Sequence, residues 1–508
     1  MTKRNSIALL YFTLLQLSSL TAQNIFVAPD GSDNNPGTIS QPLISISAAI
    51  TKAKIGDTIF VRGGTFNYNT TISIAKSGTA NFRYCIFAYK KERPVLDFSS
   101  QVVGSSNRGI RLSNASYWHI KGLDIKGAGD NGMEISGGSY NIIEFCSFYE
   151  NRDSGLQLSN GASNNQVINC DSYNNSDPTE GNADGFAPKL TVGSGNYFYG
   201  CRAWQNSDDG WDGYLRGANN ITTILENCWS FKNGFRKDGT QTAGNGNGFK
   251  MGGGDNSNSD RLMHHVTAKR CLAFDNKAKG FDQNNNDGSM TILNCTGFRN
   301  LTADYRITRE LNSGQTLIVK NSISYLGLVE LGSFALQEKN SWLAPFNISA
   351  NDFVSLDASQ ATRTRKEDGT LPDITFMHLV SGSQFVDAGV DVGLPFKGLA
   401  PDIGAFEYEG PSSINAKDFI LSDIILYQNF PNPFNPETKI SFALSRELDI
   451  KLEVFDLLGR SVKILTSGKY QSGTYTFVFN AEWASSGIYF YRLTTAQNSL
   501  TKRFVLLQ

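Results

Sequence analysis

The chain has 508 residues, of which 40% are hydrophobic, and its formal net charge is −1. A charge so close to zero excludes the broad basic surface by which proteins bind nucleic acid. The 49 glycines favour many short strands joined by turns over a bundle of helices.

The first residues have the pattern of an export signal. Lys3 and Arg4 precede an apolar run from Ile7 to about Leu20, and small or polar residues follow it. We therefore expect residues 1–22 to be a signal peptide and the mature protein to act outside the cytoplasm. No later apolar run approaches the length that spans a membrane.

Six of the seven cysteines mark a repeat, because each is followed by an aromatic residue after three positions and by an asparagine after five. The sets are Cys146, Cys170, Cys201, Cys228, Cys271 and Cys295; Tyr149, Tyr173, Trp204, Phe231, Phe274 and Phe298; and Asn151, Asn175, Asn206, Asn233, Asn276 and Asn300. A glycine followed by a bulky apolar residue then recurs, as in Gly185-Phe186. A repeat of ~25 to 40 residues with short strands predicts a solenoid, here an all-β, right-handed parallel β-helix.

Equivalent residues of such a helix stack in ladders. We expect the asparagine ladder to bond amide to amide and to the backbone of each turn. The cysteine and aromatic ladders are expected to fill the interior. Cysteines acting as small buried hydrophobic residues are favoured over stacked disulfides, because their number is odd and their spacing follows the repeat.

The chain divides into four expected segments. After the signal peptide, the β-helix is expected to occupy residues 23–408, with an apolar-periodic stretch from Ile44 to Ala53 forming a helix that caps its first coil. The regular pattern fades between about Leu317 and Tyr408. A Gly-, Pro- and Ser-rich linker covers residues 409–423, and strand-like segments at 439–442, 451–455 and 487–491 predict a small β-sandwich within residues 424–508.

This C-terminal segment closely resembles type IX secretion sorting domains. The resemblance rests on the run Pro431-Asn432-Pro433-Phe434-Asn435-Pro436, on the turn at residues 456–460 and on Ser486-Gly487-Ile488-Tyr489. It implies export across an outer membrane by the type IX secretion machinery, followed by release or by attachment to the cell surface. A carbohydrate-binding sandwich is the alternative interpretation.

Acidic residues gather beside the glycines of the repeat. Because side chains alternate along a strand, residues one before and two after each glycine share the outward face. Asp184, Asp209, Asp212 and Lys250 take these positions, and Asp208 lies in the adjoining turn. Four carboxylates on two adjacent coils repel one another unless a cation lies among them, and oxygen-only ligands favour Ca²⁺. The alternative is that these are ordinary solvated turn aspartates.

Lys250 is expected to lie one coil away from Asp212. A bound cation and partial burial would lower the pKa of this lysine, which could then act as a neutral base. Such a base can remove the C5 proton of a uronic acid, after which the O4-linked sugar is lost by β-elimination. The alternative is a lysine that simply pairs with Asp212.

Three segments of the chain strongly resemble the pattern of polysaccharide lyase family 9, which contains pectate lyases and rhamnogalacturonan lyases with a β-helical fold. They are residues 182–190, 206–212 and 247–252, and the resemblance extends over about residues 24–408. It implies that the catalytic calcium is bound by Asp184, Asp208, Asp209 and Asp212, and that Lys250 is the base. The implied substrate is an acidic pectic polysaccharide, either polygalacturonate or rhamnogalacturonan. Lys189 and Arg216 are predicted to bind further carboxylates of the substrate.

Two other functions stay open at this point. A β-helical hydrolase of the polygalacturonase type would use paired carboxylates for inverting hydrolysis, although none of the four histidines lies in the Gly-His-Gly element of that type. A non-catalytic surface adhesin would need only a solenoid and a sorting domain, and it would leave the aspartates and Lys250 without a role. We expect a monomer that binds no nucleic acid and has no membrane span.

Overall fold

The computed structural model describes residues 22–408, 424–426, 429, 432, 434–444, 447–457, 459–471, 473–495 and 499–507. Residues 1–21 of the expected signal peptide and the whole expected linker, 409–423, lie outside the described residues. The chain separates into two compact units, and each is described by itself.

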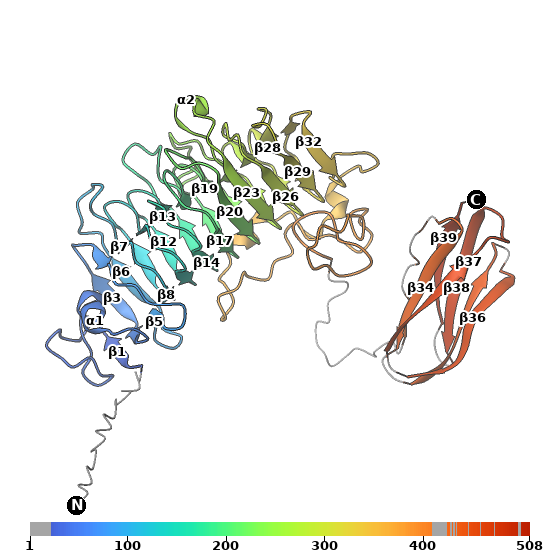
Figure 1. Ribbon diagram of the computed structural model, residues 1–508, viewed down its shortest axis with the longest axis horizontal. Helices are drawn as coiled ribbons and strands as arrows, with labels where there is room; N and C mark the ends of the chain where they lie inside the picture. The colour runs from blue at the N-terminus through green and yellow to red at the C-terminus, as the bar shows by residue number, and fades with distance from the viewer. Residues whose placement is uncertain are drawn as a thin grey trace, which may run out of the picture. The chain divides into compact units, whose positions relative to one another are not determined.

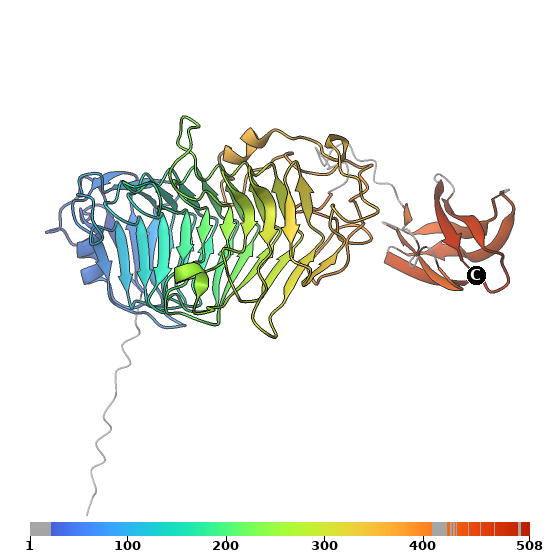
Figure 2. The ribbon, with the colours of Figure 1, turned by 90° about the horizontal axis from the view of Figure 1, so that it is seen from above.

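The first unit is a parallel β-helix in which most coils contribute one strand to each of three sheets (Figures 1 and 2). The first sheet contains β1 (Asn24–Val27), β2 (Thr58–Val61), β5 (Tyr84–Ala88), β8 (Trp118–Lys121), β11 (Ile142–Glu144), β14 (Gln166–Ile168), β17 (Asn196–Tyr199), β20 (Ile221–Glu226), β23 (His264–Lys269), β26 (Met290–Leu293), β29 (Leu317–Lys320) and β32 (Ala335–Glu338). The second contains β3 (Gly64–Asn67), β6 (Pro94–Asp97), β9 (Asp124–Lys126), β12 (Ser147–Tyr149), β15 (Asp171–Tyr173), β18 (Arg202–Trp204), β21 (Trp229–Phe231), β24 (Leu272–Phe274), β27 (Thr296–Phe298) and β30 (Ile323–Tyr325). The third contains β4 (Ile72–Ile74), β7 (Ile110–Ser113), β10 (Met133–Ser136), β13 (Leu156–Ser159), β16 (Phe186–Pro188), β19 (Trp211–Asp212), β22 (Phe249–Lys250), β25 (Lys279–Asp282), β28 (Ala303–Ile307) and β31 (Val329–Leu331). The predicted fold class is confirmed.

The asparagine ladder forms in the turn between the second and third sheets, as predicted. The side-chain amide of Asn151 donates to Oδ1 of Asn175, and that of Asn175 donates to Oδ1 of Asn206, both at 2.9 Å. The same pattern continues through Asn233 and Asn276. Each amide thereby replaces sheet pairing that the backbone gives up at the bend.

The cysteine ladder is buried in the interior, and all seven cysteines are free thiols. The expectation of buried cysteines without disulfides is therefore confirmed. Burial raises the pKa of Cys170 and Cys201 well above the ordinary thiol value, so these sulfurs stay protonated and unreactive.

The aromatic ladder does not fill the interior, and that prediction was wrong. Phe148 points into the core, and because side chains alternate along the strand its neighbour Tyr149 points out. The rings stack along the outer face of the second sheet, with the centroids of Tyr173 and Trp204 4.3 Å apart. The segment after β32 buries the later rings of the ladder, such as Phe274, in a second apolar cluster outside the helix.

The N-terminal end of the β-helix is closed by α1 (Ile46–Lys52), which lies beside β1 in Figure 1. Ile46, Ala49 and Ile50 on one face of α1 join the interior core, which confirms the expected capping helix. The segment that follows β32 holds the 3-10 helices η1 (Ala350–Asp352) and η2 (Ala358–Thr362). Arg365 anchors this segment, because its guanidinium donates to Asp171 Oδ1 at 2.7 Å in β15.

The second unit consists of two antiparallel sheets. One contains β33 (Ile424–Leu426), β34 (Glu437–Leu444) and β37 (Gly473–Asn480), and the other contains β35 (Leu448–Phe455), β36 (Ser461–Tyr470), β38 (Gly487–Thr495) and β39 (Ser499–Leu506). Phe442 of the first sheet and Leu452 of the second belong to one shared core, so the expected β-sandwich is confirmed. Within the ranges described, no helix has the length and apolar character needed to cross a membrane.

Candidate active site

The register of the third sheet brings the predicted site residues together. Asp212 in β19 pairs directly with Lys250 in β22. Asp184 and Asp209 lie just before β16 and β19 on adjacent coils, and the backbone amide of Asp209 donates to Oδ1 of Asp184 at 3.2 Å. These neighbours are the ones that the glycine register predicts.

Three of the four predicted metal ligands converge. One carboxylate oxygen from each of Asp184, Asp208 and Asp209 lies within 4.8 Å of the others, and all three residues are buried. Backbone amides hold the group in place: the amide of Asn247 donates to Asp209 Oδ1 at 2.7 Å, and that of Asn245 donates to Asp208. The side-chain amide of Asn247 also donates to Asp209 Oδ1, at 2.9 Å. Sequence reasoning gave no role to either asparagine, and the Asn245 contact is made by the backbone, which carries no side-chain signal.

Asp212 lies beside this trio, between two lysines. Lys250 Nζ is 3.3 Å from Asp212 Oδ1 and 3.1 Å from Asp209 Oδ2. Lys189 Nζ is 3.4 Å from Asp212 Oδ2 and 2.7 Å from Asp184 Oδ2. Four carboxylates thus face two ammonium groups, and if all four were ionised the cluster would carry two negative charges in excess.

The protonation of the four carboxylates reflects this excess. Burial, followed by the repulsion of neighbouring carboxylates that the lysines only partly offset, raises the pKa of Asp184 to about 7 and that of Asp208 to about 9. Burial also raises the pKa of Asp209. Asp212 differs, because Lys250 and Lys189 outweigh its burial and hold its pKa below the ordinary value.

Lys250 is held in its charged form by the same field. Burial opposes the charge, but Asp209 and Asp212 outweigh it and keep the pKa of Lys250 well above its ordinary value. Its Nζ also lies 5.8 Å from the ring centre of Tyr214.

The donor set fits a hard cation. Asp209 is fully buried. Among the described residues its Oδ2 accepts no hydrogen bond, and its charge is balanced by an ion pair with Lys250 at 3.1 Å. A buried oxygen left in this state is costly unless a cation or water satisfies it. A set of ligands made only of oxygen atoms, such as these carboxylates, is the kind that Ca²⁺ and Mg²⁺ take in proteins.

Part of this cluster lines an open cleft of about 480 Å³ on the outer face of the third sheet. Lys189, Asp208, Asp212 and Lys250 lie along it, and so does Arg216. Arg216 has a 63% exposed side chain, and its Nε donates to Asp255 Oδ2 at 2.9 Å beside α2 (Asp255–Asn258). The structure therefore places both further predicted substrate-binding residues in the cleft, each with a carboxylate partner already in contact.

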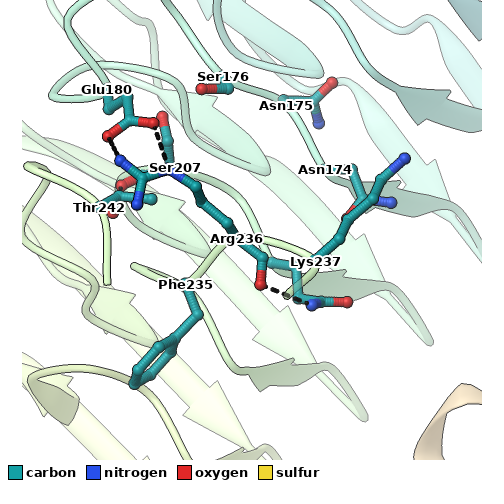
Figure 3. Close-up of a pocket in the computed structure, with 10 residues that line it drawn as sticks. Asn174, Asn175, Ser176, Glu180, Ser207, Phe235, Arg236, Lys237 and Thr242 are labelled. Carbon is teal, nitrogen blue, oxygen red and sulfur yellow. Dashed lines mark hydrogen bonds and ion pairs between the residues drawn. The ribbon is translucent and has the colours of Figure 1, made fainter. Parts of the chain in front are cut away.

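A long loop, residues 232–248, packs against the acidic cluster and donates backbone hydrogen bonds to it. Arg236 Nε donates to Glu180 Oε1 at 2.7 Å beside a separate pocket of about 200 Å³ (Figure 3). Gly244 of this loop passes so close to the cluster that an added Cβ would lie 2.7 Å from Cα of Asp208. A side chain at this position would push Asp208 out of place.

His264 has a structural environment. It is buried, its Nδ1 lies 2.8 Å from the carbonyl of Gly213, and its Nε2 lies 2.8 Å from Oγ1 of Thr223. Burial lowers its pKa to about 4. The histidine is therefore neutral under most conditions and serves packing.

Comparison with known proteins identifies the class. Residues 25–321 match the family described as Pel9A-like, right handed beta helix region, and residues 428–507 match the secretion system C-terminal sorting domain. Pectate lyase L of Dickeya chrysanthemi is 39% identical over 400 residues, which cover 76% of this chain and 91% of that protein. Pectate lyase L of Paenibacillus polymyxa (strain SC2) is 40% identical over 401 residues, covering 74% and 86%.

Two solved structures agree with these sequence relatives. Pectate lyase Pel9A superposes with a TM-score of 0.70 at 38% identity, covering 76% of this chain and 97% of that one. A rhamnogalacturonan lyase superposes with a TM-score of 0.64 at 27% identity, covering 71% and 97%.

The β-helix and its acidic, lysine-containing cleft define an enzyme of the polysaccharide lyase class. The chain belongs to the Pel9A-like β-helix family and carries a C-terminal secretion sorting domain. It is accordingly a secreted or surface-attached enzyme. The relatives named above are lyases, which favours a lyase over the adhesin and over the polygalacturonase-type hydrolase.

Proposed function

We propose that the protein cleaves an acidic pectic polysaccharide, polygalacturonate or rhamnogalacturonan, by calcium-dependent β-elimination. The observation that carries this proposal is the contact of Lys250 with a buried, oxygen-only carboxylate cluster in an open cleft. The named activities of the relatives, pectate lyase and rhamnogalacturonan lyase, support the substrate class.

Lys250 is the base in this proposal. Its Nζ lies at the cleft surface with a 10% exposed side chain, so it is shielded from bulk water and can still meet a bound sugar. The carboxylates around Lys250 favour its protonated form, and a cation bound among them would offset their field and allow the neutral amine. Neutral Lys250 takes the proton from C5 of the uronate unit. The C4–O4 bond breaks with its electron pair going to O4, O4 takes up a proton from water, and a C4–C5 double bond forms in the new non-reducing end.

Asp184, Asp208, Asp209 and Asp212 would hold the calcium ion. When bound, calcium offsets the excess negative charge of the cluster and stabilises the negative charge that develops on the substrate carboxylate. Asp212 has a second task, because it contacts both lysines and fixes Lys250 between itself and Asp209.

Lys189 and Arg216 are assigned to further carboxylates of the substrate. Each has a carboxylate partner in the free protein, and a substrate carboxylate would share or replace it. Residues 1–22 act as the signal peptide, residues 23–408 as the catalytic domain and residues 409–423 as the linker. Residues 424–508 then direct export through the type IX machinery.

The test is the ultraviolet absorbance of the unsaturated uronate product. Purified protein is incubated with polygalacturonate and with rhamnogalacturonan, in calcium or in excess EGTA. A calcium-dependent rise supports the proposal, and the faster substrate gives the specificity. New reducing ends without the absorbance, or a rate that EGTA leaves unchanged, would overturn it.

A further inference from the structure

The acidic motif beside the glycine occurs again on two earlier coils. Asp130-Asn131-Gly132 and Asp153-Ser154-Gly155 take the same places as Asp208-Asp209-Gly210, because the backbone amide of each glycine bonds to the residue before the glycine of the next coil. Asp153 thus lies two coils before Asp208. Asp130, Asn131 and Asp153 all line the cleft that holds Lys250.

Asn131 carries an unsatisfied oxygen into this second cluster. The residue is 2% exposed, and its Oδ1 accepts no hydrogen bond among the described residues. Its side-chain nitrogen donates to Asp130 Oδ2 at 3.3 Å, which fixes the orientation of the amide. A buried amide oxygen without a donor is costly unless a water or a cation satisfies it, and an amide oxygen is a calcium ligand.

The two nearby guanidinium groups, those of Arg108 and Arg111, form their shortest ion pairs with Glu134. Arg108 Nε lies 2.5 Å from Glu134 Oε2 but 3.4 Å from Asp130, and Arg111 Nε lies 3.0 Å from Glu134. Three carboxylates, those of Asp130, Asp153 and Glu134, therefore face two guanidinium groups. The ammonium of Lys189 also attracts Asp153, but it is already paired with Asp184 and Asp212, so negative charge stays in excess.

Asp153 has neutral hydrogen-bond donors around it. Its Oδ1 accepts from the backbone amide of Ser154 and its Oδ2 accepts from the side-chain amide of Asn182 at 3.1 Å. These bonds orient the carboxylate and leave its charge in place. A surface of this sign repels an acidic polysaccharide unless a cation lies between them.

We propose that Asp130, Asn131 and Asp153 form a second Ca²⁺ site, whose ion bridges the protein to a substrate carboxylate two coils away from the first site. The inference rests on the proposed function for the acidic substrate, but the cation site itself depends only on these three residues. The oxygen-only donor set, two carboxylates and one amide carbonyl, is the type that calcium prefers.

The experiment is equilibrium dialysis of the full chain against calcium, with and without galacturonate, for the wild type and for Asp153→Asn and Asp209→Asn. Asp275→Asn is the control, because Asp275 pairs with Arg299 and does not line the cleft. Circular dichroism verifies that each variant is folded. We expect two ions per wild-type and control chain, and one in each of the other variants.

The outcomes separate this proposal from the first. One ion in the wild type that Asp153→Asn keeps and Asp209→Asn loses would overturn the second site and leave the catalytic proposal intact. Two ions of which only Asp153→Asn removes one would support the second site and overturn the first. No bound ion, even with galacturonate present, would overturn both.

Discussion

Replacement of Lys250 by alanine should separate catalysis from stability. The substitution removes the proposed base, and a general base contributes ~10²–10⁴ in rate, so kcat on polygalacturonate should fall by about this factor. It also leaves Asp209 and Asp212 without the ammonium group that lies 3.1 Å and 3.3 Å from them. Breaking a buried ion pair costs ~3–5 kcal/mol, so the calcium-free variant should unfold at much lower denaturant concentration.

Calcium changes only the second of these two effects. In saturating calcium the cation takes over the compensation of the carboxylates, so most of the lost stability should return while kcat stays low. The assay pairs product absorbance with urea unfolding, each with calcium and with EGTA. Lys279→Ala is the matched control, because Lys279 lies on the next coil, pairs with Asp282 at 3.3 Å and is outside the site. A folded, calcium-loaded Lys250→Ala protein with more than about a tenth of wild-type kcat would refute Lys250 as the base.

Three further predictions concern acid stability, the ladder and the substrate. Burial opposes ionisation of Asp171, but Arg365 and Arg202 outweigh it and lower its pKa to about 2 from the ordinary 3.8. The resulting ~2 kcal/mol of stability is fully present above pH 4 and should be lost as the pH falls towards 2. Urea unfolding measured as a function of pH should show this loss in the wild type and not in Asp171→Asn. The Asn206 side chain takes part in four hydrogen bonds, so Asn206→Ala should lower the unfolding free energy by about 4 kcal/mol, at ~1 kcal/mol for each bond. The control Asn34→Ala, at an exposed position, should lower it by less than ~0.5 kcal/mol. Equal effects of the two substitutions would contradict a stabilising role of the asparagine ladder. Methyl esterification removes the substrate's charge, so highly methylated pectin should react at least ~10-fold more slowly than its de-esterified form, and equal rates would exclude carboxylate bridging.

The repeat made the fold predictable, because it fixes where each coil turns. The register of Asp212 beside Lys250 followed from the alternation of side chains counted from a glycine. The same counting failed for the aromatic ladder, since Tyr149 faces outward and only the segment after β32 decides which rings are buried. The segment after β32 is held on this sheet by the long-range contact of Arg365 with Asp171, which no local sequence pattern predicts.

The candidate site was predictable as a group, but its internal pairing was not. The sequence places four aspartates and a lysine on one face, and the structure divides them into a buried trio and an Asp212 that lies between two lysines. Lys189 approaches Asp184 from the residue after β16, a position that depends on how the chain leaves that strand. Asp130 and Asp153 carried the same Asp-x-Gly signal and were overlooked, because no lysine stands beside them in the repeat.

Burial protects the thiols of the cysteine ladder from oxidants in the native protein, and unfolding exposes them. The six thiols of the ladder are buried in the core, so dissolved oxidants do not reach them while the coils are stacked. Unfolding exposes all six thiols at once on neighbouring repeats of one chain. They can then form non-native disulfides, which prevent refolding. Outside the cell the lifetime of this enzyme is therefore governed by how rarely its coils open, a rate and not an equilibrium.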